Sequence, residues 1–277
     1  MSVRVGLVQM RAGVSRAANI ADAEKRIREA AGEGARLILT PEMTNVLDRD
    51  AKRLLADLPR EEGLTEIQRF ADLAGELDID LVIGSMAVKL FQGAAANRSY
   101  VFSPAGRQVA SYDKIHMFDV DLPTGESWRE SRLYKAGSAA KLVETRAAKI
   151  GLSICYDIRF PHLYRDLACA GAEVLTVPAA FTAPTGEAHW ETLLRARAIE
   201  TGSYVLAAAQ GGEHEDGRRT WGRSTVVEPW GEVIAKLKHD RPGVLLADLD
   251  LANVADARAR IPNLANVREY RVETKRS

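Results

Sequence analysis

The sequence predicts an α/β protein built as a four-layer αββα sandwich, in which two mixed β-sheets pack face to face and helices cover their outer faces. Three observations support this prediction. Apolar strand patterns alternate with amphipathic helix patterns along the 277 residues, and each half of the chain carries a hairpin pattern. A helix layer on one face of each sheet leaves a second apolar face, which is buried when the two sheets pack together.

The first half of the chain contains three strand patterns, two helix patterns and a hairpin. Apolar residues recur at helical spacing in residues 19–31, and Gly32 ends that helix. Thr65 and Gln68 have the spacing of a capping box, which predicts the start of the second helix. In chain order the predicted elements are strand 3–9, helix 19–31, strand 37–40, helix 65–77, strand 79–84, and a hairpin formed by 99–102 and 108–112.

The second half repeats this order without similarity between individual residues. Pro161 occupies a favoured first helical position, and Gly171 and Gly202 follow the two helices. The predicted elements are strand 150–154, helix 161–170, strand 174–177, helix 189–201, strand 204–209, a hairpin formed by 224–227 and 233–237, and strand 244–249. No Pro-, Gly- or Ser-rich linker separates the halves, so we expect residues 1–277 to form a single domain.

Composition argues against several classes of function. The 38 Lys and Arg residues balance the 38 Asp and Glu residues, so no net field attracts nucleic acid or an anionic bilayer. We find no apolar run long enough to span a membrane and no secretory pattern at the N-terminus. Two cysteines cannot form a disulfide framework, and metal-binding or phosphate-binding motifs are missing from the sequence. We therefore expect a cytoplasmic protein with no metal, no cofactor, and no nucleic-acid or membrane partner.

Three polar residues directly follow apolar runs, where open α/β sheets bind their ligands. Glu42 follows residues 37–41, Lys114 follows the first hairpin, and Cys155 lies between a strand and the helix that Pro161 begins. Position alone leaves Cys155 evenly balanced between a nucleophile and a buried structural cysteine. Cys169 lies within a predicted helix among apolar residues, so we expect it to be packed in the core.

A nucleophilic thiol needs a base or a cationic neighbour. The five histidines are scattered, and the residues around Cys155 lack the patterns of the common Cys–His proteases. His116 shares a strand face with Lys114 and could line a pocket, although a structural role is favoured for it. A carboxylate base with an ammonium partner is the remaining solution.

Three blocks of sequence resemble the nitrilase superfamily of carbon–nitrogen hydrolases. They are Thr40-Pro41-Glu42, Tyr112-Asp113-Lys114-Ile115-His116, and the run from Gly151 to Pro161 around Cys155, in the order and approximate spacing of the family. The resemblance extends over essentially the whole chain and is strongest to the Nit branch. It implies the αββα fold, a small-molecule amide substrate, and a homodimer or higher homo-oligomer.

The resemblance also implies a mechanism. Cys155 would attack the amide carbonyl to form a thioester, and Glu42 would serve as the general base in both half-reactions. Lys114 and the backbone N–H of Tyr156 would stabilise the tetrahedral oxyanion.

Further residues are implied by the same resemblance. Glu130 matches a second glutamate beside the lysine, and Glu126 is the alternative for that position. Arg159 would bind a substrate carboxylate, although a salt bridge to Asp157 or Glu42 is the structural alternative. Phe181 and Thr185 would line the acyl pocket.

Several functions stay open at this point. The first is hydrolysis of deaminated glutathione, which releases 2-oxoglutarate and Cys-Gly. An ω-amidase acting on 2-oxoglutaramate, or a broader aliphatic amidase, is the nearest alternative. From another class, the chain could be a catalytically silent scaffold, but it retains all three catalytic residue types.

Overall fold

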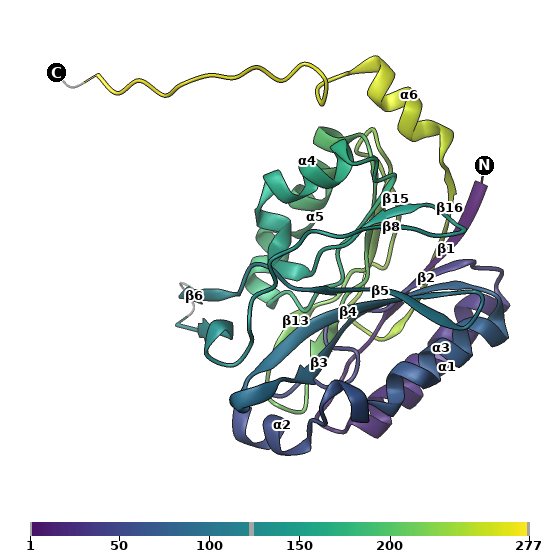
Figure 1. The fold of residues 1–277 in the computed structure, drawn as a ribbon, viewed down its shortest axis with the longest axis vertical. Coiled ribbons are helices and arrows are strands. Elements are labelled where there is room, and N and C mark those ends of the chain that lie inside the picture. The colour runs from purple at the N-terminus through teal and green to yellow at the C-terminus, as the bar shows by residue number, and fades with distance from the viewer. Residues whose placement is uncertain (1, 122–124, 276–277) are drawn as a thin grey trace.

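The computed structural model describes residues 2–121 and 125–275 and contains two six-stranded mixed sheets (Figure 1). Parallel pairing joins the consecutive strands at the centre of each sheet, and antiparallel hairpins extend the edges. The first sheet has the order β16 (Gly243–Asp250), β1 (Ser2–Gln9), β2 (Leu37–Leu39), β3 (Asp80–Lys89), β4 (Ala95–Ser103), β5 (Arg107–Asp113). The second has the order β15 (Val233–Lys236), β14 (Thr225–Val227), β11 (Tyr204–Ala207), β10 (Val174–Thr176), β9 (Lys149–Gly151), β8 (Leu142–Glu144).

Helices cover the outer faces of both sheets, which confirms the predicted four layers. Figure 1 shows α1 (Arg16–Gly32) and α3 (Thr65–Leu77) together beside the first sheet, and α4 (Pro161–Cys169) and α5 (Ala183–Thr201) beside the second. Two short helices, α2 (Ala51–Asp57) and α6 (Ala252–Arg260), lie outside these layers. Two small hairpins, β6 (Asp119–Asp121) with β7 (Ser127–Arg129) and β12 (Gly211–Glu213) with β13 (Arg219–Trp221), complete the fold.

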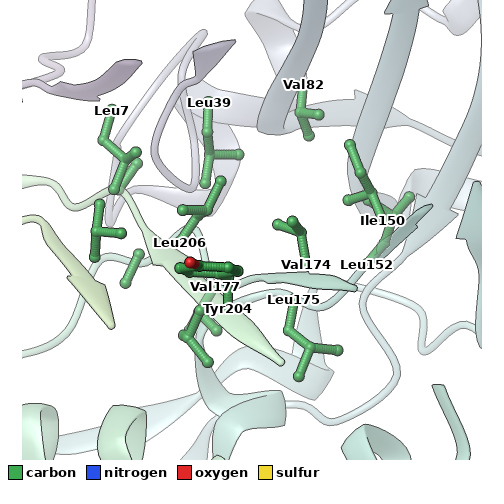
Figure 2. Close-up of a cluster of buried hydrophobic side chains, with 14 of the residues drawn as sticks. Leu7, Leu39, Val82, Ile150, Leu152, Val174, Leu175, Val177, Tyr204 and Leu206 are labelled. Carbon is green, nitrogen blue, oxygen red and sulfur yellow. The ribbon is translucent and has the colours of Figure 1, made fainter. Parts of the chain in front are cut away.

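Alternation along the strands builds the core between the sheets. On β2, Leu37 and Leu39 belong to the inter-sheet cluster, whereas Ile38 packs in the cluster beneath α1 and α3. Figure 2 shows Leu39 and Val82 of the first sheet facing side chains of the second. Each fully buried aliphatic side chain of this kind contributes about 1.5–3 kcal/mol to stability.

The last strand was placed correctly along the chain, but its partner was not predicted. β16 pairs antiparallel with the whole of β1, from Ser2 opposite Asp250 to Gln9 opposite Gly243. The chain therefore leaves the second sheet after β15 and returns to the first. This pairing ties the two halves together along one edge.

Three local predictions are wrong in detail. The Thr65–Gln68 capping box does not form, because Leu64 is the N-cap of α3 and the Gln68 amide donates to Asp72 instead. Helix α5 begins at Ala183, before the predicted start at 189, because Pro184 favours its first turn. Strand β9 ends at Gly151, since the chain then leaves the sheet towards Cys155.

Cys169 is exposed, contrary to the prediction of a core position. The buried residues of α4 are Leu163, Tyr164, Leu167 and Ala168. Cys169 lies about 100° further around the helix, on the solvent side. Within the described residues, no helix is sufficiently long and apolar to cross a membrane.

Candidate active site

Glu42 is positioned by a close approach of backbone segments at the end of β2. The Gly84 N–H donates to the Thr40 hydroxyl (3.0 Å), and the Ser85 N–H donates to the Pro41 carbonyl (3.2 Å). A Cβ atom on Gly84 would lie 2.0 Å from the Thr40 carbonyl oxygen. Glycine is therefore required beside Glu42, because any side chain would push the Glu42 segment away from β3.

Lys114 lies between two carboxylates. Its Nζ is 2.9 Å from Glu42 Oε1 and 2.8 and 3.0 Å from the two oxygens of Glu130. The Lys114 side chain is 2% exposed. Within the described residues, Lys114 pairs with Glu130 and not with Glu126, so Glu130 is the second carboxylate at the lysine. Two hydrogen-bonded partners offset the cost of burying one ammonium.

Asn97 links the same two carboxylates and was missed in the sequence. Its Nδ2 donates to Glu42 Oε1 (2.9 Å) and to Glu130 Oε1 (3.2 Å). The Ala180 N–H donates to Glu42 Oε2 (2.8 Å), and the Phe118 N–H donates to Glu130 Oε2 (2.7 Å). Both carboxylates are thus held in one orientation by donors from segments far apart in the sequence.

Cys155 lies in a strand-to-helix elbow, as the sequence predicts, at the start of a 3₁₀ helix (Cys155–Arg159). Its φ angle is 48°, in the left-handed region that a non-glycine residue rarely adopts. The Cys155 N–H donates to the Pro178 carbonyl (2.9 Å), which ties the elbow to the segment after β10. Such a conformation costs about 1–3 kcal/mol and persists where the surroundings hold it in place.

A buried carboxylate, Asp157, holds the elbow. Asp157 is fully buried and accepts hydrogen bonds from the Tyr112 hydroxyl (2.7 Å) and the Ile154 N–H (2.8 Å). It also accepts from the His116 N–H (3.0 Å) and lies 2.7 Å from His116 Nδ1. The His116 ring stacks on Phe160 with centroids 3.5 Å apart. His116 therefore supports the elbow from behind, in agreement with the structural role favoured for it.

The pKa values at the site depend on burial and on neighbouring charge. Desolvation tends to raise the pKa of Glu42, but the Lys114 charge and hydrogen bonds from Lys114, Cys155 and Asn97 outweigh it and lower the pKa below 4.5. Desolvation and the charge of Glu42 raise the pKa of Cys155 well above 9.0. Burial works to lower the pKa of Lys114, but Glu130 and Glu42 raise it well above 10.5. At neutral pH the site therefore holds the Cys155 thiol, an ionised Glu42 and the Lys114 ammonium.

These groups open onto a cavity of about 600 Å³. Its wall includes Tyr156, Arg159, Phe181 and Thr185, the residues expected to bind substrate. The Arg159 guanidinium lies 5.5 Å from the Phe181 ring centroid and 3.2 Å from His189 Nδ1. Within the described residues, Arg159 forms no salt bridge with Asp157 or Glu42. Arg159 therefore lines the cavity wall as a cation without a carboxylate partner within the described residues.

We expect Asp157→Asn to destabilise the protein and misplace the nucleophile. The asparagine amide presents N–H groups to neighbours that themselves donate hydrogen bonds, so some buried donors lose their acceptor. We expect this loss to lower the free energy of unfolding by about 2–4 kcal/mol. Urea unfolding measures this change, and Asp166→Asn on the exposed side of α4 is the matched control. A variant as stable as the wild type would contradict the supporting role of Asp157.

Comparison with known proteins identifies the family of this chain. The sequence profile of the carbon–nitrogen hydrolase family matches residues 4–259. The chain is 39% identical over 264 residues to mouse (Mus musculus) deaminated glutathione amidase, covering 93% of this chain and 81% of that protein. It is 34% identical over 277 residues to human (Homo sapiens) omega-amidase NIT2, covering 99% of each.

A solved structure shows the same fold. The NitFhit protein of C. elegans matches with a TM-score of 0.89 and 33% identity, covering 96% of this chain. This chain spans 65% of the length of that protein. The predicted resemblance to the nitrilase superfamily and its Nit proteins is thus confirmed. The chain belongs to the carbon–nitrogen hydrolase family and is an amidohydrolase.

Proposed function

We propose that Cys155, Glu42, Lys114 and Glu130 form the catalytic site of a cysteine-dependent amidase acting on small amides that carry a carboxylate. The observation that supports this proposal is the buried thiol beside a hydrogen-bonded carboxylate–ammonium–carboxylate group at the base of the 600 Å³ cavity. A neutral thiol next to an ionised Glu42 is the arrangement that general-base activation of a nucleophile requires.

In the first half-reaction, the Cys155 sulfur attacks the amide carbonyl carbon while the thiol proton passes to Glu42. A C–S bond forms, and the carbonyl oxygen becomes an oxyanion. The Tyr156 N–H makes no hydrogen bond within the described residues, so it can donate to that oxyanion. The charge of Lys114 also stabilises the oxyanion. The C–N bond then breaks as Glu42 gives its proton to the leaving amine, which leaves a thioester.

In the second half-reaction, Glu42 takes a proton from water, and the resulting hydroxide equivalent attacks the thioester carbonyl. The C–S bond breaks, the carboxylic acid product leaves, and the sulfur recovers its proton from Glu42. Glu130 and Asn97 orient Lys114 and Glu42 throughout and exchange no proton in this scheme.

We propose deaminated glutathione as the substrate, with 2-oxoglutarate and Cys-Gly as products. The mouse relative with that name is 39% identical, against 34% for the human ω-amidase, which supports this order of preference. Arg159 would bind the 2-oxoglutaryl carboxylate, while Phe181 and Thr185 line the acyl part of the cavity. An ω-amide of a 2-oxo dicarboxylic acid shares that acyl group and differs in the leaving amine.

We further propose that the chain forms a single domain and that two copies associate as a homodimer. The compartment that we propose is a reducing cytosol. Trp230 and Ile199 are more than half exposed and lie together, since Gly231 is packed against the Ile199 side chain. An exposed apolar patch of this kind is typical of an interface. Both cysteines are unpaired, as a reducing compartment requires. Analytical ultracentrifugation of wild type and Ile199→Glu measures the oligomer, and a monomeric wild type would contradict the dimer.

A panel of amides tests the substrate proposal. We expect Cys-Gly release from deaminated glutathione to have a higher kcat/KM than ammonia release from 2-oxoglutaramate, because the longer leaving amine fills more of the cavity. Simple aliphatic amides without a carboxylate serve as controls for Arg159 binding. Faster turnover of 2-oxoglutaramate would favour the ω-amidase, and failure to hydrolyse any amide would overturn the proposed function.

A further inference from the structure

We propose that Arg218, together with Arg49 and Trp128, forms a second anion-binding subsite that takes a carboxylate on the leaving amine of the substrate. This inference rests on the proposed amidase function and deepens it. It defines the substrate as an amide with an anionic group on each side of the scissile bond, one for Arg159 and one for Arg218.

The subsite is a tryptophan ring contacted by two guanidinium groups. The Arg218 Cζ lies 4.5 Å from the Trp128 ring centroid, and the Arg49 Cζ lies 4.4 Å from it. All three residues line the cavity that contains Cys155. Cation–π contacts of this length orient a guanidinium group without occupying its N–H donors, so those donors stay available for a ligand.

The Arg218 side chain is partly buried, and its guanidinium group makes no hydrogen bond within residues 2–121 and 125–275. Its side chain is 17% exposed, and its Nε is a buried donor without a partner. Asp216 forms an ion pair with the Arg218 terminal nitrogen at 3.6 Å, a distance too long for a direct hydrogen bond. Burial lowers the pKa of Arg218, but an arginine stays charged. A partly buried cation with an unpartnered buried donor is stabilised by an anionic ligand.

The position of Arg218 matches the leaving-amine side of the reaction. The leaving nitrogen takes its proton from Glu42 in the proposed mechanism, so the leaving group must lie on the Glu42 side of the sulfur. Arg218 is close enough to Glu42 for the carboxylate charge to act on it. A group attached to the leaving nitrogen would therefore extend from Glu42 towards Arg218.

Arg159 and Arg218 lie at the two ends of a row of aromatic contacts. From Trp128 the row passes to Phe118, with centroids 6.3 Å apart, and from Phe118 to Tyr156, 5.1 Å apart. The Arg159 Cζ lies 5.9 Å from the Tyr156 centroid. The two cations thus contact different rings and can bind two separate carboxylates.

The excess of positive charge around the cavity supports a doubly anionic substrate. Among the described residues, six basic and three acidic side chains line it. Glu42 and Glu130 are both bound to Lys114, and Asp48 accepts hydrogen bonds from Arg53. Arg129 is paired with Asp121, and Arg218 lies 3.6 Å from Asp216. Arg49, Arg132 and Arg159 have no ion pair within the described residues, so the cavity keeps an excess of positive charge, which attracts anions.

The hairpin that carries Arg218 is anchored, so the subsite is preorganised. His214 Nδ1 lies 2.8 Å from the Ala12 carbonyl, and its Nε2 lies 2.7 Å from the Thr220 hydroxyl. The Arg218 N–H donates to Asp216 Oδ1 (2.9 Å) in the turn between β12 and β13. Anchoring at both ends of the turn lowers the ordering cost of ligand binding.

The test compares two substrates that differ in one charge. Both are 2-oxoglutaryl amides of Cys-Gly, one with a free C-terminal carboxylate and one with that carboxylate converted to a carboxamide. We expect Arg218→Gln to lower kcat/KM for the free acid by about 10- to 100-fold, mainly through KM. For the carboxamide we expect a change below about twofold. Arg219→Gln, the same change at the exposed neighbouring residue, should leave both substrates unaffected.

Three results with Arg218→Gln would overturn the subsite: an equal loss of kcat/KM on both substrates, no loss of kcat/KM on the free acid, or a loss that lies entirely in kcat. A wild type without preference for the free acid over the carboxamide would also overturn it. If Arg218→Gln does not fold, exposed Arg49→Gln must show the same selective loss of at least about threefold. A wild type that turns over 2-oxoglutaramate without preferring the free acid contradicts the subsite but not the amidase. A wild type inactive on every amide overturns both.

Discussion

Cys155→Ala is expected to lower kcat for amide hydrolysis by about 10⁴-fold or more, because no other group can form the thioester. The substitution removes one sulfur from a side chain that is 7% exposed at the edge of the cavity. Alanine tolerates the backbone of residue 155 about as well as cysteine does, so the melting temperature should change little. Release of Cys-Gly or ammonia, measured beside a thermal melt, separates catalysis from folding.

Cys169→Ala is the matched control for the thiol. Cys169 is exposed on α4 and lies outside the cavity wall, so its removal should leave kcat unchanged. Mass spectrometry of the wild type during turnover should also show the mass of the acyl group on the peptide that contains Cys155. Equal product release by Cys155→Ala and wild type would remove the assigned nucleophile.

Glu42→Gln is the second variant with a large expected effect. Since Glu42 moves a proton in both half-reactions, we expect kcat to fall by about 10²- to 10⁴-fold. Glutamine has nearly the same shape, and Lys114 keeps its pair with Glu130 at 2.8 Å. The free energy of unfolding should therefore change by no more than about 1–2 kcal/mol. Steady-state kinetics and urea unfolding on the same preparation measure the two effects.

The pH profile gives an independent check on Glu42. Its pKa is lowered below 4.5, so the carboxylate form persists as pH falls until the pH passes below that value. The wild type should thus keep its kcat/KM from neutral pH down to about pH 4.5, provided that the protein stays folded. Glu126→Gln, which changes a carboxylate of the same loop region as Glu130, should leave the profile unchanged. If Glu42→Gln retained more than about a tenth of the wild-type kcat, Glu42 would not be the base.

Much of the fold could be predicted because its elements are encoded locally. The apolar run Leu37-Ile38-Leu39 and the helical spacing of Ile20, Ala23 and Ile27 are visible within a few residues. The pairing of β16 with β1 was not predictable in this way. It joins residues more than 230 positions apart, such as Gln9 and Gly243, and depends on which sheet edge is open after folding.

The candidate site likewise contains residues that the sequence predicts and residues that it does not. Glu42, Lys114 and Cys155 follow strand patterns, so their positions could be found in the sequence, and the resemblance to a known family identified their chemistry. Asn97 and Arg218 lie within a hairpin strand and a turn that carry no distinguishing motif. Their importance comes from contacts across the fold, Asn97 with Glu42 and Arg218 with Trp128. Local patterns do not contain such contacts.

Cys169 shows that apolar neighbours in the sequence do not by themselves predict the burial of a helical residue. Apolar neighbours such as Leu167 and Ala168 suggested a core position, yet these two residues themselves fill the buried face of α4. A residue next to a filled face points towards solvent, because successive side chains are rotated by about 100°. The position of a helical residue around the axis therefore decides its burial more than the character of its neighbours.

The left-handed backbone at residue 155 limits which nucleophiles this scaffold can acquire during evolution. A threonine has two heavy atoms on Cβ, which clash with the backbone when φ is positive, as it is at 48° here. Serine has an unbranched Cβ and fits the same backbone. A lineage that exchanged sulfur for oxygen at this elbow would therefore be restricted to serine, and a threonine hydrolase would first require a rebuilt turn.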